Sequence, residues 1–255
     1  MGLFSRLGKV GKREAVKPVL PPGLLVYAIG DIHGRDDLFS DLLARIDRDR
    51  GQRTYESCAL VLLGDLVDRG PDSDKVVERA LSLSSHFDRV HHLIGNHEEC
   101  MISALSGDVR ALRYFARIGG DATIRSYLRD DTLYENASFE ELSELFRQRV
   151  PSAHIDFLRR GEDMVRYGDY AFVHAGVRPG VALDRQAVSD LRWIREEFLS
   201  ASDPFGAMVV HGHTISDQVE MRPNRIGIDT GAYCTGALTA LGVEGEQQWV
   251  VQAYC

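Results

Sequence analysis

The chain lacks any hydrophobic run long enough to cross a membrane. Its longest apolar stretches, such as Leu24–Ile29 and Ala59–Leu63, are far shorter than the ~20 residues that span a bilayer. Positive charge is also scarce, because 30 Lys and Arg residues face 38 Asp and Glu residues, for a formal net charge of −8. A phosphate backbone attracts an excess of positive charge, so this balance argues against general nucleic-acid binding. We therefore expect neither a transmembrane segment nor a nucleic-acid partner.

Cysteine is rare as well. The four cysteines form no CxxC pair and have no zinc-ribbon spacing; they are Cys58, Cys100, Cys234 and Cys255. A chain of 255 residues can bury a sizeable core without cross-links. We therefore expect these cysteines to be reduced thiols and the protein to be cytoplasmic.

Residues 1–22 differ in composition from the rest of the chain, since they carry five basic residues and a single acidic residue. They contain neither the apolar region nor the small-residue cleavage site of a secretory signal. Arg6 stands where a myristoylation motif needs Ser or Thr. We expect a basic mobile arm over residues 1–22, which ends at Pro21-Pro22, followed by a single catalytic domain over residues 23–255. A weak contact of the arm with an anionic membrane surface or an acidic partner is the alternative.

From Gly23 onward, apolar runs of strand length alternate with helical patterns. The expected strands are Leu24–Ile29, Cys58–Leu63, Val90–Ile94, Tyr170–Val173, Ala207–Val210, Arg225–Ile228, Ala237–Val243 and Gln247–Tyr254. Helices over Asp36–Asp49 and Ser73–Ser85 separate the first three strands, which predicts right-handed crossovers and a parallel sheet. The spacing of the last three runs suggests an antiparallel or mixed sheet. Residues of about 100–166 are expected to form a helical insertion.

Polar residues that can bind metal ions follow five of these strands. The five motifs are GDIHG at 30–34, GDLVDRG at 64–70, GNHE at 95–98, HAG at 174–176 and HGHT at 211–214. Because ligands bind at the carboxyl ends of strands in open α/β sheets, we expect the motifs to converge on one edge. Carboxylates and imidazoles suit Mn, Fe, Zn or Ni. The set predicts two metal ions ~3.5–4 Å apart that polarise water and hold a transferred phosphoryl group.

In their order, the five motifs resemble the phosphoprotein phosphatase family of metallophosphoesterases, and most of all its short bacterial and phage members such as lambda protein phosphatase. The similarity runs over most of residues 24–245 and includes Trp193-Ile194-Arg195 and Ile228–Thr239. It implies an α/β fold of the calcineurin-like metallophosphoesterase type, an α+β sandwich of two mixed β-sheets flanked by helices. The insertion at about 100–166 would be a helical cap beside the site.

The resemblance also implies a set of metal ligands. The first ion would be held by Asp31, His33 and Asp65, and the second by Asp65, Asn96, His174 and His213. His211 is the alternative to His213 as the last ligand. If it is not a ligand, it is expected to contact the ligand residues without touching the metal ion. Two divalent ions are expected, with Mn first and Fe, Zn, Ni or Mg as alternatives.

The remaining roles concern the phosphate and the leaving group. By the same resemblance, Arg69 and Arg195 would bind the phosphate, and Asn96 is also counted among the substrate-binding residues. His97 would protonate the leaving oxygen while Asp68 orients its ring. A hydroxide that bridges the metal ions would attack phosphorus directly, so no thiol is needed as the nucleophile.

The first functional expectation is a monomeric protein phosphatase, a phosphoric monoester hydrolase. Its partner would be a protein or peptide that carries phosphoserine or phosphothreonine, with phosphotyrosine as a further substrate. The alternative is a symmetrical hydrolase of diadenosine tetraphosphate and other dinucleoside polyphosphates, which shares the metal motifs. Two positions favour the phosphatase: Asp68, where such hydrolases tend to have Ala, and Glu98, where they tend to have Asp. A phosphate-binding module without turnover is a third reading, against which the presence of Arg69, His97 and Asp68 argues.

Overall fold

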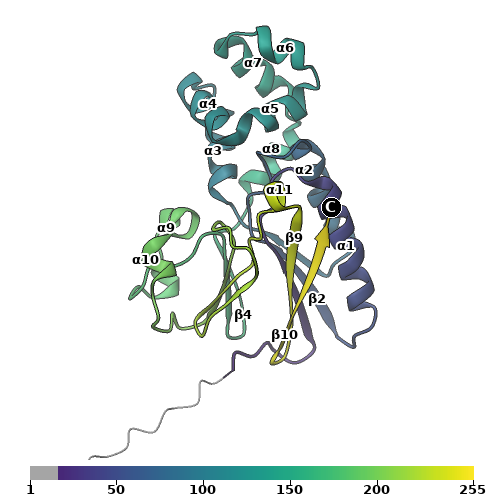
Figure 1. Ribbon diagram of the computed structural model, residues 1–255, viewed down its shortest axis with the longest axis vertical. Helices are drawn as coiled ribbons and strands as arrows, with labels where there is room; N and C mark the ends of the chain where they lie inside the picture. The colour runs from purple at the N-terminus through teal and green to yellow at the C-terminus, as the bar shows by residue number, and fades with distance from the viewer. Residues whose placement is uncertain (1–16) are drawn as a thin grey trace, which may run out of the picture.

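Residues 17–255, the part of the chain that this computed structural model describes, form two five-stranded sheets with helices on their outer faces (Figure 1). The first sheet has the order β10–β9–β1–β2–β3, with bounds β1 Leu24–Ile29, β2 Ser57–Leu62, β3 Arg89–His92, β9 Ala237–Glu244 and β10 Gln247–Tyr254. The second sheet has the order β4–β5–β6–β8–β7, with bounds β4 Met164–Tyr167, β5 Tyr170–Val173, β6 Met208–His211, β7 Glu220–Met221 and β8 Arg225–Gly227. The expected sandwich of two mixed sheets between helices is confirmed.

Strand β1 shows why the central strands are continuously apolar in sequence. Tyr27 and Ile29 point into the core shared with the helices, whereas Val26 and Ala28 pack between the two sheets. All four side chains are fully buried. A strand that is buried on both faces cannot show the alternation of a half-exposed strand, so its sequence is an unbroken apolar run.

The strand pairing agrees with the sequence in the first sheet and differs from it in the second. Strands β1, β2 and β3 are parallel, while β9 and β10 form an antiparallel hairpin. Strand β8, which the sequence groups with that hairpin, instead lies parallel to β6 in the second sheet. The sequence did not predict β4 or β7, which have only four and two residues and are too short to show a clear period.

Helices α1 (Asp36–Arg50) and α2 (Ser73–Ser82, continued by the 3₁₀ turn Leu83–Ser85) cover the first sheet. Short helices α9 (Val188–Trp193) and α10 (Glu196–Leu199) cover the second. The outer face of the second sheet buries Phe198 of α10 against Val173 and Val209. The predicted helices thus appear, and the short helices after β5 complete the second outer layer.

The helical cap lies above one end of the sandwich (Figure 1). Its helices are α3 Asn96–Ala104, α4 Val109–Phe115, the π-helical turn Ala116–Gly120, α5 Asp121–Leu128, α6 Asp131–Asn136, α7 Phe139–Arg149 and α8 Ser152–Arg159. Phe115 and Phe146 stack in its core with ring centroids 6.0 Å apart, and they belong to the same hydrophobic cluster as α1 and α2. The cap and the body therefore share one core. The helices end at Arg159, so residues 164–166, which the sequence assigns to the insertion, belong instead to β4.

The end of the predicted basic arm packs against the fold. Leu20 is 1% exposed, its amide N–H donates to the carbonyl of Gly245, and the amide of Val19 donates to the Asp169 carboxylate. In the described part of the arm, the packed region thus begins before the predicted boundary at Gly23, because Leu20 contributes to the core between the sheets. The arm prediction for residues 1–16 lies outside the described residues. No helix formed by residues 17–255 is long and apolar enough to cross a membrane.

Candidate metal and phosphate site

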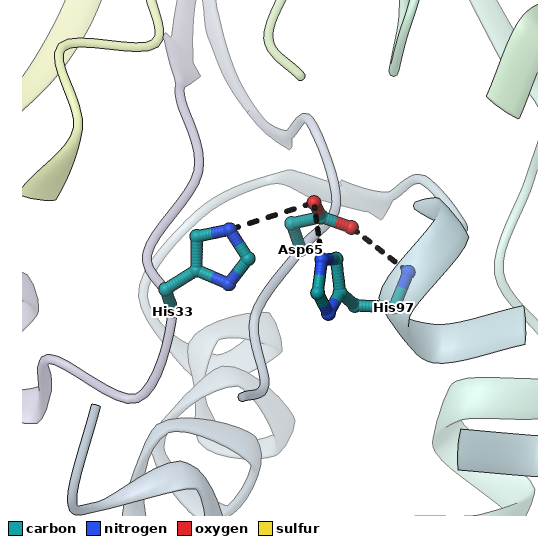
Figure 2. A group of neighbouring side chains, drawn as sticks. All are labelled: His33, Asp65 and His97. Atoms are coloured by element: carbon teal, nitrogen blue, oxygen red, sulfur yellow. Dashed lines mark hydrogen bonds and ion pairs between the residues drawn. The ribbon is translucent and has the colours of Figure 1, made fainter. Parts of the chain in front are cut away.

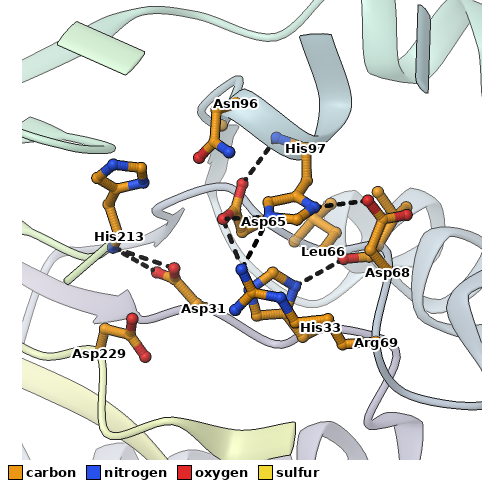
Figure 3. A network of polar contacts seen from close by, with 12 residues as sticks. Asp31, His33, Asp65, Leu66, Asp68, Arg69, Asn96, His97, His213 and Asp229 are labelled. Carbon is orange, nitrogen blue, oxygen red and sulfur yellow. Dashed lines mark hydrogen bonds and ion pairs between the residues drawn. The ribbon is translucent and has the colours of Figure 1, made fainter. Parts of the chain in front are cut away.

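All five motifs meet at the carboxyl ends of β1, β2, β3, β5 and β6, and Figure 3 shows labelled residues of four of them side by side. Four motifs begin one to three residues after the last residue of their strand. The fifth, HGHT, begins at the last residue of β6. Because these strands run in the same direction within each sheet, their ends deliver the polar side chains to one place. The convergence expected from the sequence is therefore present.

The turns that carry the site have unusual backbone geometry. Six non-glycine residues in the described chain have positive φ, and five of them lie in these motifs: His33, Asp65, Asp68, Arg69 and His213. Their φ values run from 47° to 75°. Such conformations cost free energy for residues with a Cβ and persist only where surrounding contacts enforce them.

Two glycines of the motifs are required for close approach. A Cβ on Gly95 would lie 2.1 Å from Asp65 Oδ1, and a Cβ on Gly212 would lie 2.0 Å from Asp31 Oδ1. Both distances are far inside van der Waals contact, so only glycine lets these backbone segments pass beside the carboxylates.

Asp65 lies at the centre of the donor groups. His33 Nε2 is 3.6 Å and His97 Nε2 is 3.9 Å from Asp65 Oδ2, so one carboxylate oxygen has an imidazole on either side (Figure 2). The other oxygen is 3.4 Å from His174 Nε2, which in turn is 3.2 Å from His213 Nδ1. The structure thus forms two groups with metal-ligand spacing that share Asp65. A shared carboxylate is what a bridging ligand requires.

The other two expected ligands lie at the margin of these groups. Asn96 Oδ1 is 3.1 Å from His174 Nε2, beside the second group. The carboxylate of Asp31 accepts hydrogen bonds of 3.0 and 3.1 Å from the amide N–H of His213 (Figure 3). Asp31 belongs to neither three-donor group. The sequence assigned Asp31 to the first ion together with His33 and Asp65, but in the structure the third member of that group is His97. The ligand role of Asp31 therefore stays a prediction.

Burial controls the charge of the candidate ligands. It lowers the pKa of His174 to about 4 and that of His213 to about 2, and it holds the pKa of His33 well below its usual value. It raises the pKa of Asp65 to about 6, and burial together with nearby carboxylates raises that of Asp31 well above its usual value. Neutral imidazoles are the form that binds metal, and buried carboxylates gain most from a neighbouring cation.

The two histidines of the last motif differ in position. The Nε2 atoms of both His211 and His213 are inaccessible to solvent and have no hydrogen-bond partner among residues 17–255, but His213 lies beside His174, with its Nδ1 3.2 Å from His174 Nε2. His211, the alternative ligand, lies elsewhere: its Nδ1 is 3.0 Å from the carbonyl oxygen of Gly212, and its ring packs against Phe198. His213 is thus the histidine of this motif that joins the donor groups, and the donor set fits divalent cations.

The predicted acid and its orienting carboxylate are in direct contact. His97 Nδ1 is 2.5 Å from Asp68 Oδ2, and both side chains are almost fully buried. The cap completes this arrangement, since the Thr123 hydroxyl donates to Asp68 Oδ1 at 2.6 Å and accepts from the Asp68 amide at 2.8 Å. Thr123 was not predicted from the sequence, where it is one polar residue in a helical stretch. Burial raises the pKa of Asp68, and the Thr123 hydrogen bond opposes that shift.

Arg69 lies beside the acid. Its Nη2 is 3.1 Å from His97 Nε2, its guanidinium lies 4.6 Å from the centre of the Tyr233 ring, and its amide donates to the carbonyl of Gly119 in the cap. Arg195 is exposed, and its charge contributes after burial to the low pKa of His213. Arg69 thus contacts the acid, and the charge of Arg195 is close enough to affect His213.

Two further buried carboxylates lie at the site without having been assigned a role from the sequence. Glu98 is fully buried and accepts hydrogen bonds from the amides of Asp65, Leu66 and Gly95, so it fixes the turn that carries the central ligand. Asp229 is also buried, and its charge is among the causes that raise the pKa of Asp31. Its position just after β8 is the same signal that identified the other motifs.

The Calcineurin-like phosphoesterase family model matches residues 24–234, and the chain belongs to this family. It is a hydrolase of the metallophosphoesterase type, a family that uses divalent metal ions. The sequence-based family expectation is confirmed at this level. The narrower resemblance to lambda protein phosphatase is not confirmed.

Several curated relatives are symmetrical bis(5'-nucleosyl)-tetraphosphatases. That of Delftia acidovorans is 31% identical over 61% of this chain and 46% of its own length, and that of Acidovorax ebreus is 35% identical over 61% and 45%. The chain thus spans about half the length of these relatives. A zinc-dependent endopolyphosphatase of Saccharomyces cerevisiae is 25% identical over 85% of this chain and 74% of its own.

Among solved structures, a putative diadenosine tetraphosphatase has a TM-score of 0.62 at 22% identity and covers 94% of this chain and 99% of its own. A cold-active protein tyrosine phosphatase has a TM-score of 0.57 at 18% identity, with coverage of 91% and 81%. At these identities the similarity establishes the fold alone.

Proposed function

We propose that the protein hydrolyses dinucleoside tetraphosphates symmetrically, into two nucleoside diphosphates. The observation that carries this proposal is the identity of 31–35% with relatives named for that activity, over 61% of the chain. It replaces the protein phosphatase that the sequence favoured, for which the relatives give no support.

The structure offers a reason why the two discriminating positions were weak guides. Glu98 accepts hydrogen bonds from backbone amides, and Asp68 contacts His97 and Thr123. Both carboxylates are fully buried behind the residues that would touch the substrate. Glu98 therefore acts on the backbone of the turn and carries little information about substrate choice, whereas Asp68 acts on the acid His97.

The residues of the site divide the chemistry between them. Divalent ions at the two donor groups would polarise the attacking water and the phosphate oxygens. Arg69, which lies against His97, would turn its guanidinium to the phosphate and bind it bidentately, and Arg195 would bind it from the exposed side. His97 would carry a proton on Nε2 to the departing oxygen, while Asp68 holds Nδ1 and stabilises the charged ring.

A substrate panel tests the proposal. The metal-stripped protein would be loaded with Mn, Mg, Zn or Ni, with Mn proposed as the most effective ion. It would then be given diadenosine tetraphosphate, a phosphoserine peptide, inorganic polyphosphate and nitrophenyl phosphate. We expect diadenosine tetraphosphate to have the highest kcat/KM and to yield ADP as its nucleotide product. A product mixture of AMP and ATP, or faster hydrolysis of the phosphopeptide, would overturn it.

A protein phosphatase remains the second candidate because of the close contact between His97 and Asp68. A serine alkoxide is a strongly basic leaving group and needs a proton donor more than a nucleoside diphosphate does. In that case the partner would be a phosphorylated protein or peptide, and the same panel would identify it.

A further inference from the structure

A cavity of about 670 Å³ lies beside the site, between the body and the cap. Arg69 lines it, together with Lys75 at the start of α2 and Ala122, Arg125 and Arg129 of the cap. The volume falls within the range of small-molecule sites, which is about 300–1,000 Å³. The cavity adjoins a second one of about 570 Å³ that shares Lys75 and Arg129, so the space continues along α2.

The position of the catalytic acid relates this cavity to one half of the substrate. A general acid must lie beside the oxygen that leaves, so His97 marks the leaving-group side of the phosphate. Arg69 Nη2 is 3.1 Å from His97 Nε2, and the Arg69 side chain reaches toward His97 (Figure 3). Arg69 also lines the cavity, so the cavity adjoins the acid His97 through Arg69.

The charges in the cavity indicate what kind of group it accepts. Acidic and basic side chains line it in equal number, four of each. Three of the basic ones are already paired: Lys75 with Asp72, Arg125 with Asp131 and Arg129 with Asp74, each at 2.6 Å. Arg69 instead faces His97. The cavity therefore offers an unpaired cation only at its end near the phosphate, and beyond it a polar lining without excess positive charge.

This lining fits a nucleoside better than a longer polyphosphate. Carboxylates accept hydrogen bonds from ribose hydroxyls, and a planar guanidinium can stack on a base. Arg125 is placed for the second role: its guanidinium lies 4.0 Å from the centre of the Tyr134 ring, and Tyr134 is not part of the cavity wall. Because Arg125 itself lines the cavity, its guanidinium can also contact a ligand there.

We propose that this cavity binds the nucleoside diphosphate half of the substrate that leaves from His97; the inference rests on the proposed function. In the reaction, one P–O bond forms between the attacked phosphorus and the oxygen of water, and the P–O anhydride bond to the bound half breaks. One proton of the water is released, and the departing oxygen receives its proton through His97. The bound half is then a nucleoside diphosphate, held by Arg69 at its phosphates and by the cap at its nucleoside.

The test fills the cavity and measures selectivity. Ala122→Leu adds volume to the cap wall, and Ala153→Leu is the matched control, an exposed alanine on α8 that lines a different cavity. We expect Ala122→Leu to lower the ratio of kcat/KM for diadenosine tetraphosphate to that for nitrophenyl phosphate at least tenfold. It should also raise the inhibition constant of ADP at least tenfold relative to that of inorganic phosphate. The control Ala153→Leu should match the parent protein in the kcat/KM ratio and in the relative inhibition constant of ADP.

The outcomes separate the two proposals. If the parent protein hydrolyses nitrophenyl phosphate and not diadenosine tetraphosphate, the proposed function is wrong. Binding of a nucleoside diphosphate in the cavity is then tested by inhibition alone. ADP must inhibit nitrophenyl phosphate hydrolysis more strongly than phosphate does, and Ala122→Leu must remove that difference. If Ala122→Leu lowers both substrates equally and leaves the relative strength of ADP inhibition unchanged, the cavity does not bind the leaving group.

Discussion

The metal-binding edge and the helical cap contribute to one site in different ways. The edge supplies the donor atoms: His33 and His97 lie beside Asp65 in one group, and His174 and His213 lie beside it in the other. The cap supplies support, since Thr123 holds Asp68 and the carbonyl of Gly119 holds the Arg69 backbone. The sheet therefore fixes where the metals bind, and the cap fixes how the acid and the phosphate-binding arginine are oriented.

Substitutions in the two regions should separate these contributions. Changes at the edge should remove the metal ions and every activity together. Changes in the cap should leave the metal content unchanged and alter activity in a manner that depends on the leaving group.

The largest effect is expected at the shared ligand. Asp65→Asn removes a charge from both donor groups and should lower every activity at least ~10²-fold, with loss of bound metal measured by elemental analysis. Asp156→Asn, at an exposed position on α8, is the matched control. Chelation should abolish the activity of the parent protein. Full activity of the metal-free protein would show that these groups are not catalytic metal sites.

The next effect concerns the acid itself. His97→Asn should lower hydrolysis of a phosphoserine peptide by ~10²–10⁴-fold, and that of nitrophenyl phosphate far less, because nitrophenolate departs without a proton. Asp68→Asn should show the same pattern more weakly, since this residue orients the ring. Metal content, measured in parallel, should not change when His97 acts as the acid; loss of metal would assign it to the donor group that it forms with His33 and Asp65. Equal losses on both esters would assign His97 to phosphate binding instead.

A smaller effect of the same kind is expected from the cap. Thr123→Val keeps the shape of the side chain but removes the hydroxyl that contacts Asp68 twice. We expect hydrolysis of the phosphoserine peptide to fall roughly tenfold, because orienting partners of this kind are worth about 10–100-fold. As for His97→Asn, hydrolysis of nitrophenyl phosphate should fall less. Thr132→Val, at an exposed position on α6, is the control. Loss of bound metal in Thr123→Val would mean that the cap also positions the ligands.

The smallest effect on chemistry is expected from the N-terminal segment. A chain that begins at Gly23 loses the buried Leu20, which should lower the free energy of unfolding by about 1.5–3 kcal/mol. Turnover of nitrophenyl phosphate per folded molecule should stay within a few-fold. A chain that begins at Lys17 should have the thermal stability of the parent. Equal stability of both truncated chains would show that the Leu20 contact adds little.

The sequence by itself determined the central strands, the parallel part of the first sheet and the edge at which the motifs converge. Buried strands are unbroken apolar runs, and each motif follows its strand within a few residues, so both signals are local. The resemblance to the phosphatase family then assigned Asp65, His174 and His213 as ligands within these motifs. Only the tertiary structure decided that Thr123 and Glu98 support them, and that β4 and β7 extend the second sheet. A hydrogen bond between residues 55 apart, such as that from Thr123 to Asp68, depends on how the cap packs on the body. In sequence, a helical threonine that makes a long-range hydrogen bond cannot be distinguished from one that faces water. The contact between Thr123 and Asp68 therefore has no sequence signature.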